Sequence, residues 1–550
     1  MKPGKPYSVT LRVTTVLYLL VATFVFSSLK TKINPDGIAY LTIAKNYAHA
    51  HWAEAVNAYW SPLLSWLLAP FCWLPVEPLF IFYVINVLAG LAGIIVFYTL
   101  MVQLGFSVTL QNFLLPLCAV FMLRFAYYTS TPDLASVVLL LLFLRYWLRG
   151  NLNLRPFNTA IWLVVLYFAK AYNFFFVSGL ICFDLLTLLL NKRTNRYKLV
   201  GSFCKLYVIF FILVSPWLFA LHQKYGGLML AGTAKFNHGA AIVNLSLLGK
   251  GIPGTEALSN NYEFYTAFIN PPHEYSVFAW EDPVRKATFR DYAVFSSKDN
   301  FLLQLKVVLT NIRLLLGGYT DMHAIIGLSL CLLLIGFFIT TVSMLKNNVT
   351  LPVLLEQEIT RIFVFSCFYL SGYLLLFVED RYLWINLLVG LLGIGFLSKH
   401  LLKSANSFFS EKQFSFPGFF LTVPATAFVS YQLIWTHFFS APIFNSETGK
   451  SEYTFAKGLK KAPPYQTRMA HWPNSEDYSL YASWFTAYFS EGRHYNCLPA
   501  EISKANALIG ANNISVVFVS DTAKVPGDFV IVHWKKIVGP IPNTDVYIKP

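Results

Sequence analysis

The stretch LFIFYVINVLAGLAGIIVFYTLMV, residues 79–102, contains no charged side chain in 24 residues. A helix of about 20 apolar residues is long enough to cross a hydrocarbon core about 30 Å thick. Similar runs recur along most of the 550-residue chain, which is 56% hydrophobic and only 13% charged, with a mean hydropathy of +0.54. This composition excludes an ordinary water-soluble fold of this length. The sequence therefore predicts a mainly α-helical, polytopic integral membrane protein.

The hydrophobic runs predict about eleven transmembrane helices. The first run follows Lys2 and Lys5 and lacks a small-residue cleavage site, so we interpret it as a retained anchor and not as a signal peptide. The predicted crossings are residues 9–28, 79–102, 110–128, 133–148, 157–171, 172–190, 199–221, 322–345, 362–378, 383–399 and 416–437.

Lysine and arginine side chains predict the orientation of these helices. They gather in short connections near residues 145–155, 192–198, 346 and 399–403. The positive-inside rule places such connections, and with them the N-terminus, in the cytoplasm. We expect a bacterial inner-membrane protein whose residues 29–78, 222–321 and 438–550 lie on the exterior, periplasmic side. The net charge of +15 fits this topology and contact with anionic lipid better than nucleic-acid binding.

The chain divides into two predicted domains. Residues 1–437 form the transmembrane domain with its exterior loops 29–78 and 222–321. Residues 438–550 alternate short apolar runs, such as 514–519 and 529–532, with turn residues and a helix-like stretch at 478–489. This alternation is typical of a small soluble α/β domain. The seven cysteines suggest neither a disulfide framework nor a metal motif.

Four ionisable segments lie at expected exterior membrane edges, where charge is costly and therefore suggests function. Asp36 stands in INPDGIAY, residues 33–40, and Asp133 in STPDL, residues 130–134. Each acid, taken alone, is explained better as a helix-start residue. Lys170, in LYFAKAY at 166–172, is explained equally well by function and by snorkelling of its long side chain.

The tight turn EDRY, residues 379–382, favours function more strongly. It places three charges between the apolar runs 364–378 and 383–396, without room for a longer loop. A guanidinium held at a membrane surface is well suited to bidentate capture of a phosphate.

Together these elements resemble the C-type (GT-C) membrane glycosyltransferases, which use polyprenyl-phosphate sugars. This superfamily contains bacterial aminoarabinose transferases and protein O-mannosyltransferases. The likeness covers most of the chain. Its elements are DGIAY at 36–40, YWSPLLSW at 59–66, PDLA at 132–135, FAK at 168–170, SPWLFALHQKYG at 215–226 and EDRY at 379–382. The long acceptor-binding motifs of oligosaccharyltransferases are not visible, so the resemblance favours a single-sugar transferase.

The resemblance implies roles for eight residues. Asp36 would be the general base at the reaction centre, and Asp133 a second catalytic acid. Lys170 and Arg381 would hold the lipid phosphate of the donor. The remaining pocket residues would be Tyr40, Tyr59, Glu379 and Tyr382.

The implied function is transfer of one hexose or pentose from a polyprenyl-phosphate donor to an exterior acceptor. The acceptor would be a lipid-linked glycan, a lipopolysaccharide or a cell-wall polymer. Such a donor needs an apolar groove with cations at one end, and its transfer needs a carboxylate to receive the acceptor proton. The resemblance implies no definite cofactor and leaves a divalent cation open, because some members of the superfamily use one. The alternatives are a lipid-linked-sugar transporter or flippase and a catalytically inactive glycan-binding scaffold.

The exterior loop 222–321 contains further polar candidates. They include His238, NPPHEY at 270–275 and WEDP at 280–283. His273 and Glu274 are adjacent but lack a spaced third ligand, so ordinary loop polarity explains them better than a metal site.

Overall fold

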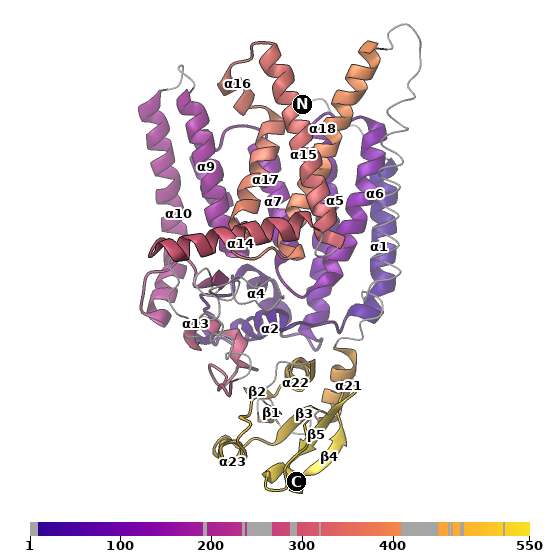
Figure 1. Cartoon of the computed structure of the whole chain (residues 1–550), viewed down its shortest axis with the longest axis vertical. Helices are drawn as coiled ribbons and strands as arrows, with labels where there is room; N and C mark the ends of the chain where they lie inside the picture. The colour runs from indigo at the N-terminus through magenta and orange to yellow at the C-terminus, as the bar shows by residue number, and fades with distance from the viewer. Residues whose placement is uncertain are drawn as a thin grey trace.

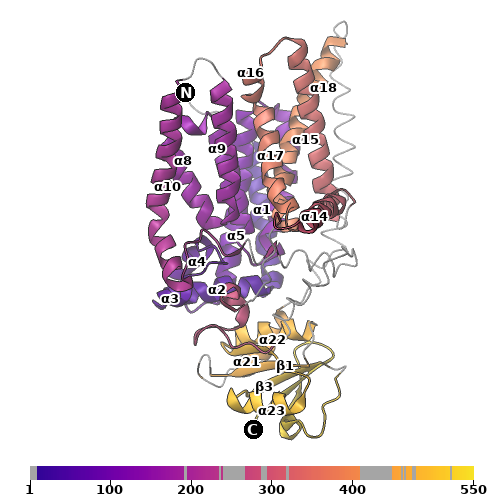
Figure 2. The ribbon, with the colours of Figure 1, turned by 60° about the vertical axis from the view of Figure 1, so that its left-hand side comes forward.

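A bundle of long helices forms the larger part of the protein, and a small sheet domain follows it (Figures 1 and 2). The computed structural model describes residues 9–190, 195–233, 237–238, 267–286, 294–317, 321–408, 449–459, 463, 466–473, 478–520 and 523–550. The C-terminus lies within the sheet domain.

Ten helices of the bundle coincide with ten of the predicted crossings. They are α1 Val9–Leu29, α5 Pro78–Gln103, α6 Val108–Tyr128, α7 Asp133–Trp147, α8 Pro156–Ala169, α9 Tyr172–Leu190, α10 Arg196–Tyr225, α15 Asp321–Lys346, α17 Glu358–Leu374 and α18 Trp384–Phe408. The eleventh predicted crossing, 416–437, lies outside the described residues. Among the described residues, seven helical spans are long and apolar enough to cross a bilayer by length and composition.

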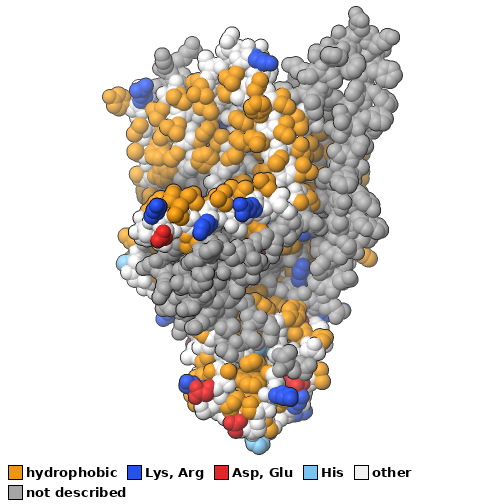
Figure 3. All heavy atoms as spheres, in the orientation of Figure 1, with side chains coloured by type: hydrophobic (Ala, Val, Ile, Leu, Met, Phe, Trp, Pro, Cys, Tyr) orange, Lys and Arg blue, Asp and Glu red, His pale blue; other side chains and the backbone are white. Residues whose placement is uncertain are grey.

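Apolar side chains cover the outside of the bundle as well as its core. On α1, for example, Phe24 is 81% exposed and Leu20 is 62% exposed. Figure 3 shows a broad hydrophobic belt around the helices on the face in view. Such a belt is unfavourable in water but stable against lipid tails, so the prediction of an integral membrane protein is confirmed.

Small residues allow the backbones of neighbouring helices in the bundle to approach each other closely. A Cβ atom on Gly393 of α18 would lie 2.9 Å from the Cα atom of Leu333 on α15. Helices in membranes commonly associate through such small residues, because close backbone approach maximises van der Waals contact.

The first predicted exterior loop contains the short helices α2 Pro35–Ala48, α3 Trp52–Ala55 and α4 Leu63–Leu68, followed by the 3-10 turn η1 Ala69–Phe71. Asn34 caps α2, because its side chain accepts the N–H of Gly37 at 3.1 Å. The Ser130 hydroxyl donates to the same Asn34 oxygen at 2.5 Å. Asp36 is therefore in the first turn of α2 but does not cap it.

The predicted exterior loop 222–321 contains a helix that was not expected from the sequence. This helix, α14 Lys298–Leu316, runs across the bundle at its lower part in Figure 1. The helix carries exposed leucines, such as Leu305 and Leu309, together with the basic residues Lys298, Lys306 and Arg313. Basic side chains also follow this helix below the hydrophobic belt in Figure 3. This pattern is typical of a helix that lies in a membrane–water interface.

Several shorter elements complete the bundle. They are the α-helices α13 Pro283–Lys286 and α16 Leu351–Leu355 and the 3-10 turns η2 Leu152–Leu154, η5 Ala279–Glu281 and η6 Asp380–Leu383.

The C-terminal part is a five-stranded α/β unit, as predicted. Its elements are α21 Lys450–Leu459, β1 Arg468–Trp472, α22 Tyr478–Phe489, β2 Arg493–Cys497, α23 Ile502–Ala511, β3 Val516–Ser520, η8 Val530–His533, β4 Lys535–Val538 and β5 Thr544–Ile548. The strand order is β2-β1-β3-β5-β4, with β1 parallel to β2 and β3, and β5 antiparallel to β3 and β4. The predicted boundary at residues 437 and 438 lies outside the described residues.

One apolar run of this unit differs from a strand. Residues 530–533 form the 3-10 turn η8, and Phe529 and Ile531 are fully buried in the hydrophobic core beside Trp472. Short apolar runs are ambiguous in sequence, and here Phe529 and Ile531 are buried while Val530 and Val532 are exposed, which is the alternation expected of a strand.

Candidate active site

A cavity of about 460 Å³ lies at the end of the bundle that faces the C-terminal unit. Its walls come from α2, the start of α7, the α8–α9 connection, η5 and the α17–η6 connection. All eight residues singled out by the sequence line it: Asp36, Tyr40, Tyr59, Asp133, Lys170, Glu379, Arg381 and Tyr382. The fold thus brings into one cavity side chains that are hundreds of residues apart in sequence.

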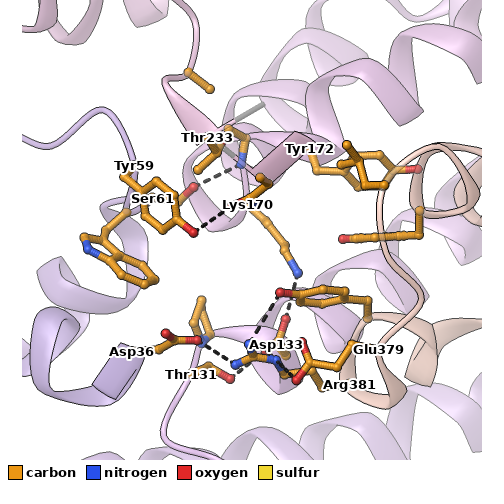
Figure 4. A pocket seen from close by; sticks show the side chains of 18 of the residues that line it. Asp36, Tyr59, Ser61, Thr131, Asp133, Lys170, Tyr172, Thr233, Glu379 and Arg381 are labelled. Carbon is orange, nitrogen blue, oxygen red and sulfur yellow. Dashed lines mark hydrogen bonds and ion pairs between the residues drawn. The ribbon is translucent and has the colours of Figure 1, made fainter. Parts of the chain in front are cut away.

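Arg381 connects three carboxylates of the cavity (Figure 4). Its Nη1 atom lies 2.8 Å from Oδ2 of Asp36, and its Nε atom lies 3.0 Å from Oε1 of Glu379. The Oδ2 atom of Asp133 is further away, at 4.0 Å from Nε. The Arg381 side chain is 13% exposed, so these pairs lie in a partly dry site where charge interactions are stronger than in water.

Lys170 forms the second ion pair. Its Nζ atom donates to Oδ1 of Asp133 at 2.8 Å, and the Thr131 hydroxyl donates to Oδ2 of the same carboxylate at 2.6 Å. The ammonium also lies 4.2 Å from the ring centroid of Tyr382. This cation–π contact holds the lysine over an aromatic face. The snorkelling interpretation does not account for an ammonium that points into the cavity toward a buried acid (Figure 4).

Local structure fixes the two cations. Lys170 follows the last residue of α8 in extended conformation, and the next N–H, of Ala171, donates to the Ser61 hydroxyl at 3.0 Å. Arg381 belongs to η6, whose neighbouring residue Asp380 pairs with Nδ1 of His323 at 2.8 Å. Asp380 therefore anchors the turn, while Glu379 and Arg381 line the cavity.

Aromatic residues form the wall near Asp36. Trp280 donates its indole N–H to Oδ1 of Asp36 at 3.0 Å, and Tyr59 donates its hydroxyl to Asn237 at 2.7 Å. Burial raises the pKa values of Tyr40 and Tyr59 above their ordinary value, and the negative charge of nearby carboxylates raises them further. Both phenols therefore stay neutral at physiological pH.

Several residues that line the cavity were not predicted as site residues from the sequence, including Thr131, Ser61, Asn237 and Tyr373. Trp280 was noted only as part of a polar loop segment. Its contact with Asp36 bridges 244 residues of sequence and depends on the tertiary fold.

Among the described residues, no group of three or more His, Cys, Asp or Glu side chains is arranged to hold a metal ion. Burial is the main cause that lowers the pKa of His273 to about 3, and the positive charge of Lys224 is the second. This imidazole is therefore neutral.

The arrangement has clear chemical capabilities. Three carboxylates face two cations, and guanidinium and ammonium groups carry further N–H donors beyond those used in these pairs. The cations are therefore able to bind an anionic oxygen such as a phosphate, while a carboxylate is placed to accept a proton.

Comparison with known proteins gives matches at the level of structure only. No protein-family model and no curated protein sequence matches the chain. Among solved structures, the archaeal oligosaccharyltransferase AglB from Archaeoglobus fulgidus, in complex with an inhibitory peptide and a dolichol-phosphate, is similar at a TM-score of 0.48 and 12% identity, covering 94% of this chain and 70% of that chain. ArnT from Cupriavidus metallidurans, bound to undecaprenyl phosphate, is similar at a TM-score of 0.46 and 11% identity, covering 98% of both chains.

Each of these two structures holds a polyprenyl phosphate of its own. At such identities and TM-scores the similarity concerns the fold alone. We therefore take the chemistry from the residues of this protein.

Proposed function

We propose that this protein is a membrane glycosyltransferase that moves one sugar from a polyprenyl-phosphate donor to an acceptor hydroxyl. The observation that carries the proposal is the cavity in which Asp36 lies against Arg381 and Asp133 against Lys170, at one end of a membrane-embedded bundle. We infer that this end is exterior, because the basic connections lie at the opposite end. We also propose that the membrane is a bacterial inner membrane, as the resemblance stated from the sequence implies.

In this proposal Lys170 and Arg381 bind the phosphate of the donor, whose polyprenyl chain remains in the lipid. Tyr172, Phe175 and Phe377 supply an apolar side of the cavity next to these cations. An amphiphilic donor needs such a combination, because its chain and its phosphate prefer opposite environments.

Asp36 acts as the general base. It takes the proton of the acceptor hydroxyl while the acceptor oxygen forms a bond to the anomeric carbon. The bond between that carbon and the phosphate oxygen breaks, and its electron pair leaves with the polyprenyl phosphate. Lys170 and Arg381 stabilise the charge that develops on this leaving group. Asp133 and Glu379 orient the two cations.

Asp36 is better placed than Asp133 for the role of base. Both carboxylates accept from two side-chain donors, but the Asp36 side chain is 18% exposed and the Asp133 side chain only 6%. A general base needs access to the acceptor hydroxyl within hydrogen-bonding distance.

The test uses purified full-length protein in nanodiscs with a panel of radiolabelled polyprenyl-phosphate sugars and acceptors extracted from bacterial envelopes. We expect label in an acceptor and an equal amount of released polyprenyl phosphate. A folded protein that neither binds nor consumes any donor would rule out the transferase. Binding without consumption would favour a scaffold, and movement of intact donor across the bilayer would favour a flippase.

A further inference from the structure

Residues 268–282, which we call the strap, are fastened to the C-terminal unit. Phe268 and Asn496 form an antiparallel β-bridge, and the N–H of Ile269 donates to the carbonyl of Tyr495 at 3.2 Å. The Arg493 side chain donates to the carbonyl of His273 at 3.2 Å. Three residues of strand β2, Arg493, Tyr495 and Asn496, thus hold the first half of the strap.

The second half of the strap is fastened to the same strand. The N–H of His494 donates to the carbonyl of Val277 at 2.6 Å. The ring of Phe278, which is fully buried, packs against Trp484 of α22 at a centroid distance of 5.3 Å. The strap is therefore part of the surface of the C-terminal unit up to residue 278.

Two residues further on, the strap reaches the candidate active site. The indole N–H of Trp280 holds Oδ1 of Asp36, while Arg381 holds Oδ2. Both oxygens of the proposed base are thus fixed by donors from outside its own helix. The carboxylate has its orientation set by the strap on one side and by η6 on the other (Figure 4 shows the Arg381 side).

The few residues between these two attachments are held firmly. The Glu281 carboxylate accepts the N–H of Val277 at 2.7 Å, which closes the turn η5 on itself. The side chain of Asn57 donates to the carbonyl of Glu281 at 2.6 Å, and the indole of Trp60 donates to the carbonyl of Trp280 at 3.1 Å. The Val277–Glu281 bond therefore links the β2 attachment at Val277 to the turn that carries Trp280, while Asn57 and Trp60 hold the same turn against the loop after α3.

We propose that the C-terminal unit positions the general base of the transferase: strand β2 holds the strap, and Trp280 of the strap orients the Asp36 carboxylate. This inference rests on the proposed function. Trp280 is a positioning residue, because it acts on the reaction through Asp36. The C-terminal unit then has a role in the chemical step although its own residues lie outside the cavity.

The first variant is Trp280→Phe, which keeps an aromatic ring but removes the N–H donor. We expect kcat to fall by about tenfold or more, as for loss of one hydrogen bond to a charged group, while donor binding stays within about twofold of wild type. Trp280→His keeps a ring N–H and should recover part of kcat. The control is Val538→Ala in β4, an 82% exposed side chain on the far strand of the sheet.

The second variant, Phe268→Ala with Arg493→Ala, loosens the strap from β2. It removes the stacking of Phe268 on Tyr495 and the hydrogen bond to His273. We expect a fall in kcat that is much smaller when Trp280 is already Phe, because both changes interrupt one route to Asp36. Equal falls in both backgrounds, or no effect of Trp280→Phe on kcat, would overturn the proposal.

Hydrogen–deuterium exchange separates this inference from the proposed function. The loosened-strap variant should exchange faster at residues 276–282 and at the start of α2, with β1 and β3 unchanged. If wild type transfers no sugar, the transferase proposal fails, and this exchange pattern still decides whether β2 holds Trp280 against Asp36. Unchanged exchange at α2 would contradict the inference whatever the activity.

Discussion

Asp36 and Arg381 are 345 residues apart in sequence, and in the folded chain Nη1 of Arg381 lies 2.8 Å from Oδ2 of Asp36. The contact joins the first short helix of the cavity to the turn before α18. The same guanidinium reaches Glu379, so a single side chain sets the relative position of a proposed base and a second acid. Changes at this residue should therefore affect both phosphate binding and the geometry of the base.

We predict that Arg381→Lys lowers transfer by at least about tenfold although it keeps the positive charge. A lysine cannot present the planar set of donors that contacts Asp36 and Glu379 together. Initial rates at varied donor concentration give the measurement. The matched control, Arg313→Lys on the exposed face of α14, should keep wild-type rates. Wild-type activity of Arg381→Lys would show that charge alone suffices.

Variants of the Lys170–Asp133 pair should separate an effect on the stability of the protein from an effect on donor binding. Lys170→Met leaves the buried Asp133 carboxylate with only the more distant Arg381 as a cation, at 4.0 Å, and we expect a loss of about 1–3 kcal/mol. Adding Asp133→Asn removes the uncompensated charge and should restore the thermal midpoint. Binding of undecaprenyl phosphate should remain weak in the double variant. Wild-type binding there would remove Lys170 from the phosphate site.

Glu281 should make the stability of the strap depend on pH. Burial raises the pKa of this carboxyl from 4.5 to about 8. Between these values the folded protein binds a proton that the unfolded chain lacks, so stability falls as pH rises, by up to about 1.4 kcal/mol per unit. Above about pH 8 the curve levels.

The measurement is the thermal midpoint of wild type relative to Glu281→Gln from pH 5 to 9. The amide keeps an acceptor for Val277 and does not titrate, so the wild-type midpoint should fall relative to this variant as pH rises to about 8. Parallel curves would show that Glu281 titrates normally.

Asn311 of α14 should support the turn that carries Arg381. Its side-chain amide donates to the carbonyls of Leu374 and Leu376 at 2.9 and 3.0 Å. We expect Asn311→Ala to lower the free energy of unfolding by about 1–2 kcal/mol. We also expect it to weaken donor binding, because the α17–η6 connection loses the two hydrogen bonds from Asn311. Thermal unfolding and undecaprenyl phosphate binding check this. Leu309→Ala, at a 54% exposed position of the same helix, should change neither.

Much of the bundle was predictable, because a transmembrane helix is specified by its own run of apolar residues. The charged edge residues were predictable for a related reason: Lys170 and Arg381 are costly where they stand, so their presence indicates use. Helix α14 was missed because Lys306, Asn311 and Arg313 interrupt its hydrophobic pattern. An interfacial helix lacks the long apolar run that marks a crossing.

The pairing within the site was less predictable. Nothing local links Asp36 to Trp280, since their contact requires the strap to be folded onto β2. The single-residue interpretation of Asp36 as a helix cap failed for a local reason, because Asn34 already satisfies the N–H of Gly37. The sequence offers separate explanations for Asp133 and Lys170, and their 2.8 Å ion pair is visible only in the folded chain.

The most direct test of the central claim compares wild type with Asp36→Asn for donor binding and for sugar transfer in the same nanodiscs. Asparagine keeps the size and an acceptor oxygen but is not a base. The account predicts donor binding close to wild type and transfer at least about a hundredfold slower. Transfer at the wild-type rate by Asp36→Asn would contradict the assignment of Asp36 as the base.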